Sequence, residues 1–158
     1  MQKDPDGFSL IELLIVVAII LVLAAIAIPN LMRSRMVTNQ ASAVGSLRII
    51  NTAEITYSST FNHGYSPDLA SLGTPGSGIP TASAAGLIDS VLISGVKSGY
   101  QFVYSATSVN GIYSAYQVNA NPLTPGSSGQ NYYFTDHSGV IRQNATGTAS
   151  SSDSPLAG

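Results

Sequence analysis

The chain has 158 residues, of which only 9% are charged, and its formal net charge is −2. A surface that binds nucleic acid needs clustered Lys and Arg, so this balance argues against nucleic acid as the main ligand. The chain contains no cysteine, which excludes disulfides and thiolate chemistry. Its length suffices for one domain together with a membrane segment.

The N-terminal third is dominated by one apolar run. Residues 1–7 form a short polar leader containing Pro5, and no charged or polar side chain occurs from Leu13 to Ile28. A helix of about 20 apolar residues crosses a hydrocarbon core of ~30 Å. We therefore predict a membrane-spanning helix over residues 8–32, kinked at Pro29 because proline removes one backbone donor.

One carboxylate, Glu12, lies near the start of this run. A charged side chain at the bilayer centre costs about 2.5–3.5 kcal/mol, so such a residue is expected to have a partner. Cleavage of the chain after Gly7 would give Phe8 a free α-amino group four residues before Glu12. That spacing is one helical turn, or the reach of a neighbouring copy.

Residues 33–61 continue the helix with an amphipathic pattern. Apolar residues recur at helical spacing on one face, and we expect that face to be buried: Val37, Val44, Leu47, Ile50, Tyr57 and Phe61. Polar positions are expected elsewhere on the helix: Arg33, Arg35, Asn39, Gln40, Arg48 and Glu54. The sequence Asn62-His63-Gly64 predicts the end of the helix.

Residues 62–146 carry the signals of a small globular domain of loops and antiparallel strands. A short helix is expected within 84–93. Alternating residues around Asn110-Gly111 predict one hairpin, and a second is expected around 136–139. The Ser-rich residues 147–158 are expected to form a flexible tail. The fold class is α+β, a long helix packed on an antiparallel sheet of about four strands.

The N-terminal residues resemble those of type IV prepilins, on the sequence Gly7-Phe8-Ser9-Leu10-Ile11-Glu12, the apolar run and Pro29. The resemblance implies the type IV pilin fold and cleavage between Gly7 and Phe8 by a prepilin peptidase, which then N-methylates Phe8. It also implies that Glu12 pairs with an N-terminal amine during assembly and that Pro29 kinks the helix.

The same resemblance implies a route to a filament. The precursor would lie in the inner membrane as a single-pass protein with a periplasmic C-terminal domain. An assembly machinery with its ATPase would then polymerise the processed subunits into a surface pilus for adhesion, twitching motility or DNA uptake. The alternative within this family is a pseudopilin of a type II secretion system.

Two other interpretations of the N-terminus stay open. One is an ordinary signal peptide cleaved at Ala25-Ile26-Ala27, and the other is a single-span anchor for a binding protein that never polymerises. No pairing of nucleophile and base appears, so no enzymatic activity is predicted. His63 and His137 lack ligand spacing, and no cofactor or metal site is predicted.

Overall fold

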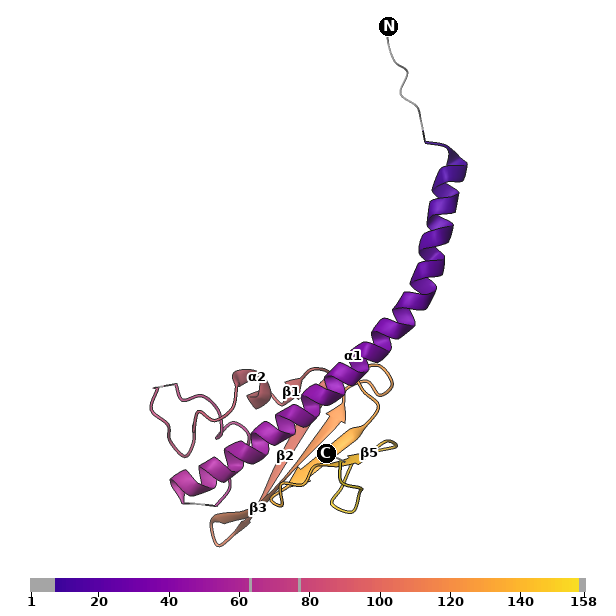
Figure 1. Cartoon of the computed structure of the whole chain (residues 1–158). Coiled ribbons are helices and arrows are strands. Elements are labelled where there is room, and N and C mark those ends of the chain that lie inside the picture. The colour runs from indigo at the N-terminus through magenta and orange to yellow at the C-terminus, as the bar shows by residue number, and fades with distance from the viewer. Residues whose placement is uncertain (1–7, 63, 77, 157–158) are drawn as a thin grey trace. The chain divides into compact units, whose positions relative to one another are not determined.

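The computed structural model describes residues 8–62, 64–76 and 78–156 (Figure 1). The chain divides into two compact units, Met1–Arg35 and Met36–Gly158. One long helix, α1 (Leu10–Phe61), contributes residues to both units. The helix begins at Leu10, whereas the sequence predicted a start at residue 8, and it continues through Pro29 to Phe61.

The second unit contains a five-stranded antiparallel sheet in the order β1-β2-β3-β4-β5. Its elements follow one another along the chain: α2 (Ser90–Ile93), β1 (Val96–Lys97), β2 (Tyr100–Val109), β3 (Ile112–Pro122), β4 (Tyr132–Asp136) and β5 (Arg142–Asn144). The fold is α+β, as predicted. The additional strand, relative to the four or so expected, is β1, which is too short to give a periodic signal in the sequence.

The hairpin of β2 and β3 forms around the turn that the sequence predicted. Asn110 and Gly111 both have positive φ, 53° and 81°, as a two-residue type I′ turn requires. Residues with short side chains or none adopt this conformation with the least strain. The second predicted hairpin is also present, as β4 and β5.

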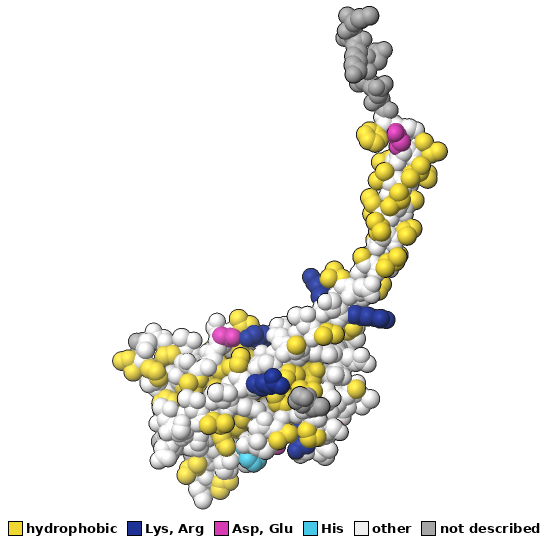
Figure 2. Space-filling view, in the orientation of Figure 1, with side chains coloured by type: hydrophobic (Ala, Val, Ile, Leu, Met, Phe, Trp, Pro, Cys, Tyr) yellow, Lys and Arg dark blue, Asp and Glu magenta, His cyan; other side chains and the backbone are white. Residues whose placement is uncertain are grey.

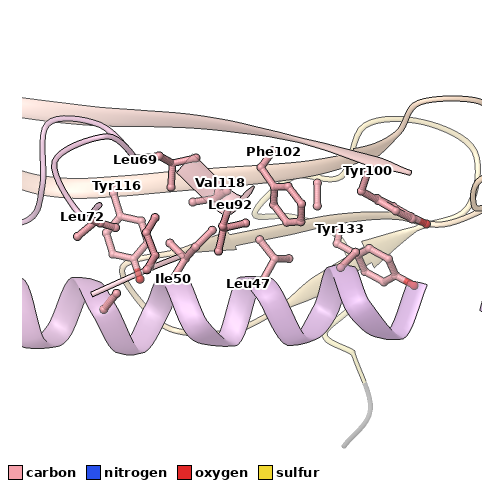
Figure 3. Close-up of a cluster of buried hydrophobic side chains, with 14 of the residues drawn as sticks. Leu47, Ile50, Leu69, Leu72, Leu92, Tyr100, Phe102, Tyr116, Val118 and Tyr133 are labelled. Carbon is pink, nitrogen blue, oxygen red and sulfur yellow. The ribbon is translucent and has the colours of Figure 1, made fainter. Parts of the chain in front are cut away.

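The core of the second unit lies between α1 and the sheet. In Figure 3, Leu47 and Ile50 of α1 point toward Phe102 and Val118 of the strands, all of them buried. Leu92 of α2 and the loop residues Leu69 and Leu72 join the same cluster. The sequence therefore identified the buried face of α1 from residue 44 onward.

The prediction of that buried face is wrong for one residue. The side chain of Val37 is 65% exposed, whereas the buried positions of α1 begin at Ala43. Helical periodicity shows which side of a helix is apolar, but it does not show where along the helix the sheet begins to cover it.

The helix expected within 84–93 is shorter than predicted and consists of α2 alone. Asp89 is its N-cap and accepts a hydrogen bond from the backbone of Leu92. The preceding residues instead pair with the loop around 71–72: the backbone amides of Ala85 and Leu87 donate to the carbonyls of Ser71 and Leu72, both at 2.8 Å.

The prediction of a flexible C-terminal tail is corrected for its described part, residues 147–156. Arg142 and Pro155 form a β-bridge, and the backbone amide of Leu156 donates to the carbonyl of Ile141 at 2.8 Å. Ala149 is 3% exposed. Backbone hydrogen bonds hold this segment although it is low in apolar side chains, and composition does not reveal such bonds.

Candidate assembly site

The first turn of α1 is organised by Ser9 and Glu12. The backbone amides of Glu12 and Leu13 donate to the carbonyl of Ser9 at 3.1 and 3.3 Å. The backbone amide of Ser9 donates to the Glu12 carboxylate, Oε2, at 2.9 Å. This is the reciprocal half of a capping box, in which the acidic side chain of the third helical residue satisfies the amide of the N-cap.

The capping box could have been found from the sequence. The pattern Ser-x-x-Glu before an apolar run is its signature, and it is present at Ser9 and Glu12. A carboxylate in the first turn also interacts favourably with the positive end of the helix dipole. Glu12 therefore has a structural role within its own chain, in addition to the partner that the sequence led us to expect.

The carboxylate lies close to the predicted processing position. It accepts its hydrogen bond from Ser9, the residue directly after Phe8. The side chain of Phe8 is 89% exposed. The predicted cleavage residue Gly7 is outside the described residues. The prediction that cleavage and methylation occur at Phe8 therefore stays a prediction, as does the pairing of Glu12 with the new amine.

The large apolar side chains of the first unit are exposed on every side of the helix. Within α1 the exposed fractions of these side chains range from 47% at Val17 and Met32 to 80% at Leu10, and Figure 2 shows them along this part of α1. By length and composition α1 can cross a membrane, and none of its most apolar stretch is buried. No described residue of the first unit covers this surface.

Pro29 lies inside this apolar part of α1 without ending it. Proline cannot donate to the carbonyl four residues earlier, and its ring crowds that carbonyl. These properties support the prediction of a kink at Pro29, which stays a prediction.

The structure reveals a buried carboxylate, Glu54, at a position that the sequence pattern had predicted to be polar and away from the buried face. Glu54 is fully buried. Its Oε2 accepts from the backbone amide of Ser66 at 2.9 Å, and its Oε1 accepts from the hydroxyls of Ser66 at 2.6 Å and Tyr104 at 2.7 Å. Burial raises the pKa of Glu54, and the hydrogen bonds from Ser66 and Tyr104 oppose that rise only in part.

A second polar residue, Asn51, lies on the same buried face. Its Nδ2 donates to the hydroxyl of Thr135 at 2.9 Å and to the carbonyl of Gly139 at 3.2 Å. Its Oδ1 accepts from the hydroxyl of Tyr116 at 2.9 Å. Buried polar groups with satisfied hydrogen bonds restrict the geometry in which two surfaces pack. Asn51 and Glu54 thus fix α1 against β3, β4 and the loop at Ser66.

The acidic residues near turns have local roles in the described structure. Asp136 accepts from the amide and hydroxyl of Ser138 at 2.9 and 2.5 Å, as in an Asx-turn. Within the described residues, no group of three or more His, Cys, Asp or Glu side chains could hold a metal ion.

Comparison with known proteins identifies the N-terminal segment. Residues 4–28 match the family model described as the prokaryotic N-terminal methylation motif. This chain carries that motif. The match covers the predicted processing position, Glu12 and most of the apolar run.

Two relatives extend the similarity. The chain is 52% identical over 48 residues to the type IV major pilin protein PilA of Myxococcus xanthus. These residues make up 30% of this chain and 22% of that protein. It is 59% identical over 34 residues to the type IV wide pilus major component PilA4 of Thermus thermophilus, 22% of this chain and 26% of that protein. The chain thus spans about a quarter of the length of the curated relatives that it matches.

No solved structure matches the chain. The long N-terminal helix and the antiparallel five-stranded sheet are nevertheless consistent with the type IV pilin fold. Both relatives are named as pilus components. Over the matched segment the chain is therefore similar to components of pili.

Proposed function

We propose that this chain is the structural subunit of a type IV pilus. One observation carries the proposal: the methylation motif at residues 4–28 opens a helix whose large apolar side chains are all exposed as far as residue 32. Such a surface is stable only when lipid or other apolar helices cover it. A precursor in a membrane and a subunit in a filament core satisfy that condition in succession.

In this proposal the precursor is a single-pass protein of the inner membrane with a periplasmic second unit. A prepilin peptidase cleaves after Gly7 and N-methylates Phe8. The assembly machinery with its ATPase then transfers the processed subunit from the bilayer to the base of a growing filament. The finished homopolymer lies on the cell surface, where it serves adhesion, twitching motility or DNA uptake.

Glu12 supplies the selectivity of assembly in this scheme. The apolar helices of neighbouring subunits bury one another, which contributes roughly 25 cal/mol per Å² of apolar surface kept from water. In that dry core the Glu12 carboxylate pairs with the Phe8 amine, which exists only after cleavage. An unprocessed subunit would leave the carboxylate buried without a counter-charge, at a cost of about 3–5 kcal/mol.

The test begins with fibres sheared from cells that produce the chain. We expect electron microscopy to show filaments whose mass spectra contain peptides of this chain with methylated Phe8 at the N-terminus. A mature N-terminus at Met1 or Ile28, with no fibre, would contradict the proposal. Processed and methylated protein that stays in the cell envelope, with no fibre on the surface, would instead favour a pseudopilin of a type II secretion system.

A further inference from the structure

Two arginines follow the apolar part of α1 directly. Arg33 and Arg35 are both exposed, whereas the ion pair found among the described residues joins Lys97 to Asp89 at 2.9 Å. The motif match ends at residue 28, before either arginine. Neither the family model nor the capping box explains why two cations stand at this point of the helix.

Their distance from Glu12 matches the thickness of a bilayer. Arg33 lies 21 residues after Glu12 in the same continuous helix. At about 1.5 Å per residue the separation is about 31 Å, and the hydrocarbon core of a bilayer is ~30 Å thick. When Glu12 lies at one interface, the arginines therefore reach the phosphate layer of the other.

The two arginines leave the helix on different sides. Residues two positions apart on an α-helix are separated by about 200°, so Arg33 and Arg35 can bind separate lipid molecules. The guanidinium group presents a planar fork of donors that matches phosphate oxygens in pairs. Its apolar stem also allows the charged end to extend from the helix to the headgroup layer.

The acidic side chains of a second copy are a poorer match for these arginines. Each acidic side chain among the described residues already accepts a hydrogen bond within its own chain: Glu12, Glu54, Asp68, Asp89, Asp136 and Asp153. In a bilayer that the apolar helix spans, lipid phosphates surround the helix at the required depth.

We propose that Arg33 and Arg35 bind the headgroups of anionic phospholipids and fix the depth of the precursor in the membrane. The proposal rests on the proposed function only in requiring that the apolar helix spans a bilayer. Withdrawal of the subunit from the membrane then requires release of these headgroups as well as transfer of the apolar surface.

The test measures lipid selectivity around the full-length chain. The precursor is reconstituted in phosphatidylcholine vesicles with a trace of spin-labelled phosphatidylglycerol or spin-labelled phosphatidylcholine, and electron paramagnetic resonance gives the motionally restricted fraction of each label. Each arginine near an anionic headgroup is expected to favour phosphatidylglycerol about fivefold at low salt. Because exposed charges are screened, the preference should fall as the salt concentration rises.

The variants separate this site from general charge effects. The double variant Arg33→Gln/Arg35→Gln should lose the preference, and Arg33→Lys/Arg35→Lys should keep part of it. The matched control is Arg48→Gln, which removes an exposed arginine of α1 well beyond the span and should leave the preference unchanged. An equal loss in the Arg48 variant would overturn the proposal.

Two outcomes distinguish this inference from the proposed function. Equal motionally restricted fractions of the two labels would show that the helix spans the bilayer but that the arginines do not select headgroups. The complete absence of restricted lipid would show that no span forms, and it would overturn both the inference and the membrane-resident precursor. A preference that depends on the ratio of protein to lipid would point to a second copy and would also contradict the inference.

Discussion

The two parts of α1 show one helix in two different surroundings. In residues 10–35 every large apolar side chain is exposed, whereas from Ala43 onward one face is buried against loops and strands. The second part is complete within its own chain, since its apolar side chains already have neighbours. The first part presents an apolar surface whose partners must come from lipid or from other chains.

The two glutamates of α1 make the same contrast. Glu54 accepts hydrogen bonds from Ser66 and Tyr104, which are 12 and 50 residues away. The hydrogen bond to Glu12 comes from Ser9, only three residues away. An ionised carboxylate offers about four acceptor positions, so Glu12 has capacity for a further donor. A tertiary network satisfies Glu54, whereas a local cap satisfies only one part of Glu12.

The sharpest test of this contrast is removal of the Glu12 charge. We expect Glu12→Gln to abolish filaments, because the Phe8 amine of a neighbouring subunit would be buried without its counter-ion, at about 3–5 kcal/mol per subunit. Glutamine still accepts a hydrogen bond from Ser9 and so keeps the capping box. The yield of sheared fibres, normalised to processed subunit in the membrane, measures the effect.

A second variant separates cap from charge at the same position. Glu12→Ala removes both, so it should assemble no better than Glu12→Gln. Filaments at wild-type yield from the glutamine variant, together with loss in the alanine variant, would assign the role of Glu12 to the helix cap alone. The contrast between the two glutamates would then be wrong.

The core of the second unit should respond to truncation far more than the exposed surface of the same helix. Leu47 is fully buried, and Leu47→Ala should lower the free energy of unfolding by about 2–5 kcal/mol. Val37 is 65% exposed, and Val37→Ala should change the free energy of unfolding by less than about 0.5 kcal/mol. Denaturant unfolding of the full chain in mild detergent gives both values. Equal effects would show that coverage of α1 does not begin where the structure places it.

Removal of the buried carboxylate should also destabilise the second unit. Glu54→Ala leaves the backbone amide of Ser66 without its acceptor, at about 1–3 kcal/mol, whereas the hydroxyl of Tyr104 keeps the carbonyl of Ser66 as an acceptor at 2.8 Å. Glu54→Gln should be milder, since its carbonyl can accept from the amide while its NH₂ donates to the hydroxyls. A glutamine variant as unstable as the alanine variant would argue against the hydrogen-bond geometry described for Glu54.

The same residue predicts a pH dependence of stability. Burial raises the pKa of Glu54 above its usual value of 4.5, so the folded state binds this proton more tightly than the unfolded state. The contribution of protonated Glu54 to the free energy of unfolding is therefore fully present below pH 4.5, and it is lost as the pH rises through the folded-state pKa. Unfolding measured between pH 4 and 8 should show this decrease, and Glu54→Gln should remove it. A profile unchanged by the substitution would contradict the assignment.

The sequence predicted the elements whose pattern is long or local. The apolar run predicted the first part of α1, and the spacing of Leu47 and Ile50 predicted the buried face of the second. Asn110-Gly111 predicted the hairpin because few residues adopt positive φ twice in succession without strain. The N-terminal motif is likewise a local pattern, so the residues Phe8 and Glu12 could be proposed as a site from the sequence alone.

Features that depend on distant partners could not be predicted in this way. Glu54 lies four residues after Ile50 and three before Tyr57, so its position on the buried face was available from the sequence. Its acidic side chain nevertheless suggested exposure, because the donors that compensate its burial lie far along the chain. The prediction for the described part of the tail was wrong for the same reason, since its backbone pairs with residues 141–143.

The smallest predicted effect concerns Asp89, an exposed residue of the second unit. Its carboxylate caps α2 by accepting from the amide of Leu92 at 2.7 Å and pairs with Lys97 at 2.9 Å. The hydrogen bond from Lys97 is the main cause that lowers the pKa of Asp89. Asp89→Ala should cost about 1 kcal/mol through loss of the cap. That loss corresponds to a fall of roughly 4 °C in melting temperature for a unit of the size of residues 36–158.

The matched variant Asp89→Asn keeps the cap and removes the charge. Asparagine and aspartate are about equally good N-caps, and an exposed ion pair contributes only about 0.2–1 kcal/mol. The asparagine variant should therefore melt close to the wild type. If both variants lose the same stability, the ion pair with Lys97 and not the helix cap is what stabilises the region around α2. A loss of filaments in either variant would further show that the exposed surface at α2 takes part in assembly, which would break the division of roles between the two parts of the chain.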